Sequence, residues 1–146
     1  MTTATKTEEI RVGQTVIRFL VEAEATAGSA ALFEFDVPPE GPMPPPHSHD
    51  SYEETLYGLR GTLTWTVDGK TTRVGPGEVL CIPRGATHHF ENTGAELATQ
   101  LAIVTPGLLG PAYFRDLAAV INVDGPPDFA AALDVMRHHG LTPATS

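Results

Sequence analysis

Four side chains of the kinds that bind transition metals lie in two stretches of the sequence. His47, His49 and Glu54 stand close together, and His88 follows further along the chain. Three imidazoles and one carboxylate form a nitrogen-rich ligand set that suits a divalent transition ion, whether Fe, Mn, Ni, Co, Cu or Zn. We therefore expect one such ion per chain, held by a fold that brings His88 back beside the first two histidines.

The residues around these ligands are regularly spaced. The first stretch, from Gly41 to Gly61, reads G-x5-H-x-H-x4-E-x6-G, and the second, from Gly77 to Asn92, reads G-x5-P-x-G-x2-H-x3-N. All ten positions match the two motifs of the cupins, and the chain resembles a small single-domain bacterial cupin of the quercetinase-like (cupin 2) group. This resemblance implies an all-β fold, a double-stranded β-helix or jelly-roll barrel, with a single metal ion.

The motif spacing also indicates which of two adjacent residues is the metal ligand. It selects Glu54 as the ligand, with Glu53 as the alternative, and His88 in preference to His89. Side chains alternate across a strand, so only one residue of each neighbouring pair can point inward. We expect Glu53 and His89 to face away from the metal.

Short alternating segments separated by glycine and proline predict many strands. Residues 31–37 and 62–67 alternate apolar with polar side chains, the pattern of strands with one buried face. Asp68-Gly69 predicts a two-residue hairpin turn, since both positions favour positive φ. The proline-rich segment 38–46 predicts a stiff loop that leads to the first histidines. Together these signals favour a sandwich or a barrel. The resemblance implies a single closed cupin barrel over residues 10–107, preceded by a flexible stretch over residues 1–9.

The pattern becomes helical in the remaining segment, residues 108–146. Gly110-Pro111 suits the start of a helix, and Phe114 and Leu117 follow at helical spacing. A break near Pro127 and a stop at Gly140 define a second helix. We expect two C-terminal α-helices whose apolar faces dock on the barrel or on a partner subunit.

Four further residues are candidates for the wall of a substrate pocket. Tyr52 and Leu56 share the strand parity of Glu54, Phe90 shares that of His88, and Trp65 lies on an apolar strand face. If these side chains point inward, the cavity is apolar with a metal at one end. Such a cavity suits an aromatic or enol-bearing small molecule.

Composition and charge exclude several classes of partner. The chain has 146 residues and a formal net charge of −9, with only nine Lys and Arg, so nucleic acids and anionic membranes are not expected partners. Cys81 is the only cysteine; it rules out an internal disulfide and is predicted to be a small buried hydrophobe. Residues 1–9 are polar, and we expect a cytoplasmic protein.

The resemblance implies three possible functions. The first is a quercetinase-like dioxygenase that cleaves an enol-bearing aromatic with O2, using Glu54 as ligand and general base. The second is a metal-dependent, non-redox cyclase or isomerase of the polyketide-tailoring type, and the third is a non-catalytic small-molecule-binding cupin. A homodimer is expected because cupins commonly dimerise.

Overall fold

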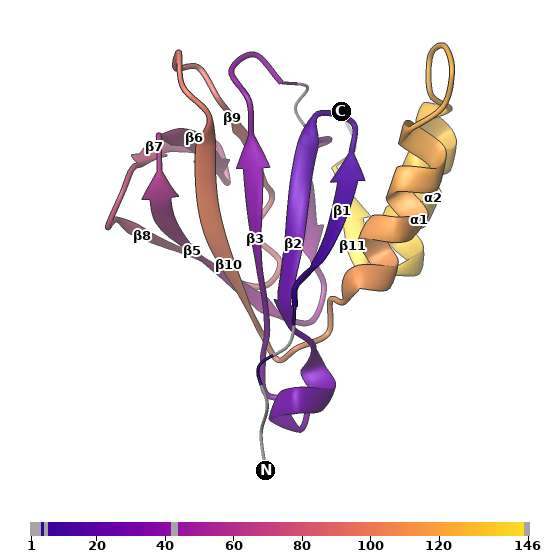
Figure 1. The fold of residues 1–146 in the computed structure, drawn as a ribbon, viewed down its shortest axis with the longest axis horizontal. Helices are drawn as coiled ribbons and strands as arrows, with labels where there is room; N and C mark the ends of the chain where they lie inside the picture. Colours follow the sequence, from indigo (N-terminus) through magenta and orange to yellow (C-terminus); the bar gives the residue numbers. More distant parts are fainter. Residues whose placement is uncertain (1–3, 5, 42–43, 145–146) are drawn as a thin grey trace.

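The strands form two antiparallel sheets that face each other (Figure 1). The computed structural model describes residues 4, 6–41 and 44–144. The larger sheet contains β1 (Glu8–Val12), β2 (Thr15–Val21), β3 (Ala31–Val37), β10 (Ala98–Thr105), β5 (Glu53–Arg60) and β8 (Val79–Ile82), in that spatial order. The smaller sheet contains β11 (Leu141–Pro143), β4 (His47–His49), β9 (His88–Glu91), β6 (Leu63–Val67) and β7 (Lys70–Val74).

Alternating side chains build the core between the sheets. Every second residue of β3 and of β10 is buried, as a strand with one face against a core requires. Aromatic rings fill the space: Phe19 and Phe33 stack with centroids 5.5 Å apart, and Phe35 lies 5.4 Å from Phe90 on the opposite sheet. The hairpin between β6 and β7 turns at Asp68 and Gly69, both at positive φ, which confirms that prediction.

The hydrogen bonds form two separate sheets, whereas the sequence led us to expect one closed barrel. Among the described residues, the larger sheet ends at β1 and β8, and the smaller ends at β11 and β7. Apolar side chains between the sheets hold them together, so the fold does not need a continuous set of backbone hydrogen bonds from one sheet to the other. The edges are protected in other ways, since helix α1 (Pro111–Ile121) packs on β1 and β8 is only four residues long.

The C-terminal segment contains the two expected helices and one strand that was not expected. Pro111 is at the start of α1, and Asp128 caps α2 (Phe129–His138) by accepting a hydrogen bond from the backbone N–H of Ala131. Gly140, at φ +83°, then turns the chain into β11, which pairs with β4. Within the described residues, no helix has the length and apolar character needed to span a bilayer.

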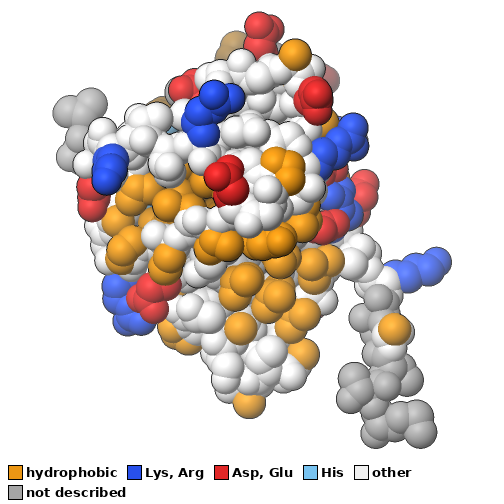
Figure 2. Space-filling view, turned by 90° about the vertical axis from the view of Figure 1, so that its left-hand side faces the viewer, with side chains coloured by type: hydrophobic (Ala, Val, Ile, Leu, Met, Phe, Trp, Pro, Cys, Tyr) orange, Lys and Arg blue, Asp and Glu red, His pale blue; other side chains and the backbone are white. Residues whose placement is uncertain are grey.

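Part of the outer face of the larger sheet is apolar. Tyr57, Leu59 and Val79 are exposed there, and Figure 2 shows hydrophobic side chains gathered in a patch on the side of the molecule that carries β5 and β8. Cys81 is also exposed, so the prediction of a buried thiol was wrong. Residues 79–82 are all apolar, and such a run gives no alternation from which to assign the buried face. The expected homodimer stays a prediction.

Gly58 allows two segments to approach closely. A Cβ at this position would lie 1.9 Å from the carbonyl oxygen of Gly75, and the backbone N–H of Gly58 donates to Glu78. Gly58→Ala is therefore expected to lower the free energy of unfolding by about 1–3 kcal/mol, as overpacking does. Chemical denaturation measures this change. Gly110→Ala is the control, because a Cβ there meets open space; equal effects of the two changes would contradict the prediction.

Candidate metal centre

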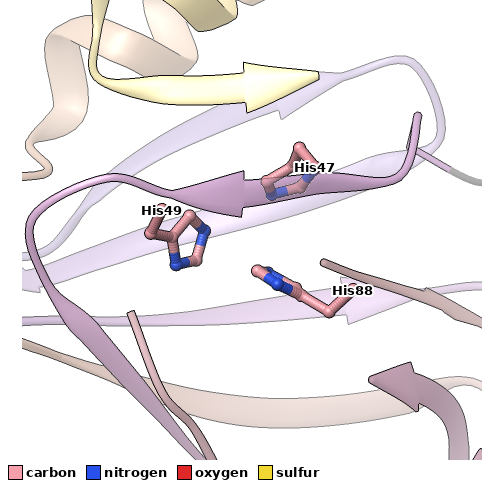
Figure 3. Close-up of side chains that lie close together, drawn as sticks. All are labelled: His47, His49 and His88. Atoms are coloured by element: carbon pink, nitrogen blue, oxygen red, sulfur yellow. The ribbon is translucent and has the colours of Figure 1, made fainter. Parts of the chain in front are cut away.

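Three histidines converge between two neighbouring strands of the smaller sheet. His47 and His49 are two residues apart on β4, so their side chains share one face, and β9 brings His88 directly opposite His47. Potential ligand nitrogens of the three residues lie within 4.8 Å of one another. The ring centroid of His88 is 4.7 Å from that of His47 and 4.5 Å from that of His49 (Figure 3). A single metal ion can be shared at these distances.

The hydrogen bonds of the rings leave nitrogens free for a metal. Nδ1 of His47 donates to the carbonyl of Pro45 at 2.8 Å, and Nδ1 of His88 donates to the carbonyl of Ala86 at 2.9 Å. A carbonyl only accepts, so each Nδ1 carries the proton and each Nε2 keeps its lone pair. Nε2 of His88 and Nδ1 of His49 are buried without a hydrogen-bond partner. Fixed tautomers and unpartnered buried nitrogens fit a divalent transition ion.

The electrostatic environment keeps these rings neutral. Burial, together with the neighbouring His88, lowers the pKa of His47 to about 4 and that of His49 to about 2. Burial also lowers the pKa of His88. Neutral imidazole is the form that binds metals, so the site is ready for an ion at neutral pH.

Glu54 lies inside the fold beside the histidine cluster. Its Oε1 is 3.8 Å from Nε2 of His88, and the residue is buried. Burial raises the pKa of Glu54 to about 7. Glu53 points the other way and pairs with Arg84, which also lowers the pKa of Glu53. The structure thus places Glu54, and not its neighbour, next to the histidines.

The other motif residues hold the two halves of the site together. The backbone N–H of Gly85, at φ +85°, donates to the carbonyl of His49 at 2.9 Å. The side chain of Asn92 is buried; it donates to the carbonyls of Val37 and Glu96 and accepts from the N–H of Gly94. These residues act on the metal site by positioning the strands that carry the ligands.

The four predicted pocket residues all lie near the histidines or in the adjoining core. The ring of Tyr52 stacks on His49 with centroids 4.5 Å apart, and Trp65 lies 6.2 Å from His88 and 4.9 Å from Phe90. Tyr52, Leu56 and Trp65 are buried, and Phe90 is partly buried. One end of the site is therefore aromatic and apolar.

Tyr113 on α1 is a site neighbour that sequence reasoning missed. The residue is buried, and burial together with the charge of Glu54 raises the pKa of its hydroxyl. Burial and Glu54 likewise raise the pKa of Tyr52, with a further contribution from Tyr113. The helical spacing of apolar residues indicated an apolar face on α1, but it did not indicate that this face would lie near Glu54.

Comparison with known proteins identifies the family. Residues 33–104 match the cupin domain model of the Cupin_2 family, and with the histidine cluster this makes the chain a small cupin. It is 30% identical over 79 residues to quercetin 2,3-dioxygenase of Bacillus subtilis (strain 168), and 34% identical over 65 residues to an uncharacterized protein of Aquifex aeolicus (strain VF5). These matches cover 54% and 44% of this chain, but only 23% and 53% of the relatives.

Solved structures share the fold over a larger part of the chain. A predicted oxalate decarboxylase of Thermotoga maritima superposes with a TM-score of 0.62 at 24% identity, covering 69% of this chain and 92% of that one. The polyketide cyclase RemF of Streptomyces resistomycificus superposes with a TM-score of 0.59 at 26% identity, covering 85% of this chain and 94% of that one.

The pairing of β11 with β4 predicts that the C-terminus supports metal binding. Leu141 lies opposite His49 and Pro143 opposite His47, and the N–H of Ala144 donates to the carbonyl of Pro46. A chain that ends at Gly140 is expected to bind metal about 10- to 100-fold more weakly, the loss typical when groups that orient ligands are removed. Competition with a chromophoric chelator measures this affinity. Unchanged affinity in a folded truncated chain would show that β4 needs no support from β11.

Proposed function

We propose that this cupin is a mononuclear metal-dependent enzyme that acts on an enol-bearing or aromatic small molecule, with quercetinase-like dioxygenation as the favoured reaction. The observation that carries the proposal is a buried carboxyl group, that of Glu54, beside three histidines that can share one metal ion. This carboxyl can serve as a fourth ligand and as a general base. The similarity to quercetin 2,3-dioxygenase supports the choice of reaction.

Each residue has a distinct role in the proposed reaction. His47, His49 and His88 would hold the metal, with Glu54 as the fourth ligand. When bound, such an ion supplies a Lewis acid for a substrate oxygen and, if it is redox-active, a path for electrons to O2. Glu54 accepts the proton of the substrate enol. In the metal-free protein, burial raises the pKa of Glu54 to about 7; a bound cation would favour the carboxylate, which is the form that accepts a proton.

The apolar side chains near the histidines bear on the part of the substrate that does not contact the metal. The ring centroid of Trp65 lies 6.2 Å from that of His88 and 4.9 Å from that of Phe90, and Leu56 is buried in the same core. The side chain of Trp65 is held in place, because its N–H donates to Gln100 at 2.9 Å. In the proposed complex, a planar aromatic body would pack against these side chains through the hydrophobic effect, and its polar enol end would face the histidines and Glu54.

Oxygen uptake tests this proposal. Protein purified without added metal is analysed for its ion, loaded fully, and mixed with a flavonol in an oxygen electrode. We expect O2 consumption well above that of the same concentration of free metal. A metal-replete protein that consumes no O2 with several flavonols or related enols would overturn the dioxygenase proposal.

A non-redox cyclase is the second candidate, and one observation favours it. The match to the polyketide cyclase RemF extends over 85% of the chain, further than the cupin domain match of residues 33–104. In a cyclisation, Glu54 would move a proton on the substrate without any need for O2. Turnover of a polyketide-like enol under anaerobic conditions, with zinc as the resident metal, would support this candidate over the first.

A further inference from the structure

Among the described residues, the buried polar side-chain atoms that lack a hydrogen-bond partner belong either to the histidine cluster or to Tyr52, whose ring stacks on it. Within the part of the chain that the structure describes, they are Nδ1 of His49, Nε2 of His88 and the hydroxyl of Tyr52. A metal ion held by the three histidines would explain the two unpartnered nitrogens. It would not explain the unpartnered hydroxyl of Tyr52. The ring of this residue lies flat against His49, with an interplanar angle of 21° and centroids 4.5 Å apart.

The unpartnered hydroxyl of Tyr52 contrasts with two buried polar side chains of the core that are hydrogen-bonded. The N–H of Trp65 donates to Gln100, and the amide of Gln100 donates to the carbonyl of Val74. The side chain of Asn92 makes three hydrogen bonds. A buried hydroxyl without a partner loses its hydrogen bonds to water and gains none, so such exceptions call for a functional explanation.

We propose that the hydroxyl of Tyr52 donates a hydrogen bond to a second oxygen of the substrate, next to the oxygen that the metal would hold. The inference rests on the proposed function and narrows its substrate class. The ring of Tyr52 lies against the metal ligand His49, so a substrate that reached both the metal and this hydroxyl would need two oxygens a short distance apart. The substrate therefore carries oxygens on neighbouring carbons, as an α-hydroxy ketone in its enol form or a catechol does. An aromatic with a single oxygen leaves the hydroxyl unpaired and binds more weakly.

The test compares Tyr52→Phe with Tyr57→Phe. Tyr57 follows closely in the sequence, but it is exposed on the outer face of β5. The first measurement is the melting temperature of the metal-free and metal-loaded proteins. Tyr52→Phe removes only an unpaired hydroxyl, so it should leave the melting temperature unchanged or raise it by about 2–4 °C. A fall clearly larger than that of the control would show that the hydroxyl is structural, and would overturn the inference.

The second measurement is binding without O2. The probes are 3-hydroxyflavone, which has a hydroxyl beside its ketone, and flavone, which lacks that hydroxyl. In the metal-loaded protein, Tyr52→Phe should weaken binding of 3-hydroxyflavone about tenfold, the effect of one hydrogen bond to an ionised acceptor, and should leave flavone binding unchanged. Tyr57→Phe should change neither.

The outcomes separate this inference from the dioxygenase proposal. Tight, Tyr52-dependent binding of 3-hydroxyflavone without any oxygen uptake in air would support the role of Tyr52 and overturn the dioxygenase. Equal affinity of wild type and Tyr52→Phe for 3-hydroxyflavone would overturn the role of Tyr52, whatever the turnover. Failure of the wild-type protein to bind either 3-hydroxyflavone or catechol would also overturn the proposed role of Tyr52.

Discussion

Replacing His88 by alanine is expected to remove most of the bound metal. His88 offers a ligand nitrogen within 4.8 Å of those of His47 and His49, and its Nδ1–H already donates to the carbonyl of Ala86. Loss of groups that merely orient ligands costs about 10- to 100-fold in metal affinity, so loss of a ligand should cost about 100-fold or more. Metal content after dialysis, measured by mass spectrometry, gives the result.

His89→Ala is the matched control for this change. His89 is the next residue on β9 and pairs with Thr66 across the sheet, outside the histidine cluster. Its replacement should leave metal content nearly intact. Circular dichroism shows whether each variant is folded, since alanine at buried position 88 also leaves a cavity. Equal metal loss from both folded variants would contradict the assignment of His88.

Replacing Glu54 by glutamine is expected to lower turnover by about 100- to 10,000-fold, the range associated with loss of a general base. Glutamine keeps the shape of the side chain and one oxygen that can bind metal, but it cannot accept the substrate proton. Metal content should fall much less than activity, because His47, His49 and His88 remain. Steady-state turnover and metal content are measured on the same preparations.

Glu53→Gln separates this effect from a general loss of charge. Glu53 is adjacent in sequence, but its carboxylate pairs with Arg84 at the surface. Since exposed ion pairs contribute little to stability, this variant should stay folded and keep nearly full turnover. If Glu54→Gln retained full activity while Glu53→Gln lost it, the base would have been assigned to the wrong glutamate.

Turns, helix starts and strand faces were predicted well from the sequence, because their physical cause is local. The Asp68-Gly69 hairpin follows from residues that favour positive φ, and α1 begins at Pro111 as proline allows. The motif spacing selected Glu54, and strand parity then predicted that Glu53 faces away, before any tertiary contact was known. The periods of strand and helix are properties of the backbone, so the sequence alone displays them.

Features that depend on a distant segment were missed or misjudged. Residues 141–143 form too short a segment to show any period, and they become a strand because β4 offers an unpaired edge. Both C-terminal helices were expected to dock their apolar faces, yet the apolar Phe129 is largely exposed at the first turn of α2. A pattern shows that a face is apolar, and only the packed fold shows what covers it.

The sequence by itself determined which residues can bind a metal and which cupin motifs surround them, because residue type and spacing are written in the chain. Only the tertiary structure decided that Glu54 is buried beside His88 with a pKa of about 7, that Tyr113 arrives from α1, and that the hydroxyl of Tyr52 has no partner. The reason is physical: desolvation and unpaired hydrogen bonds are set by the neighbours that surround a group in space, and these come from strands and helices far apart in the sequence.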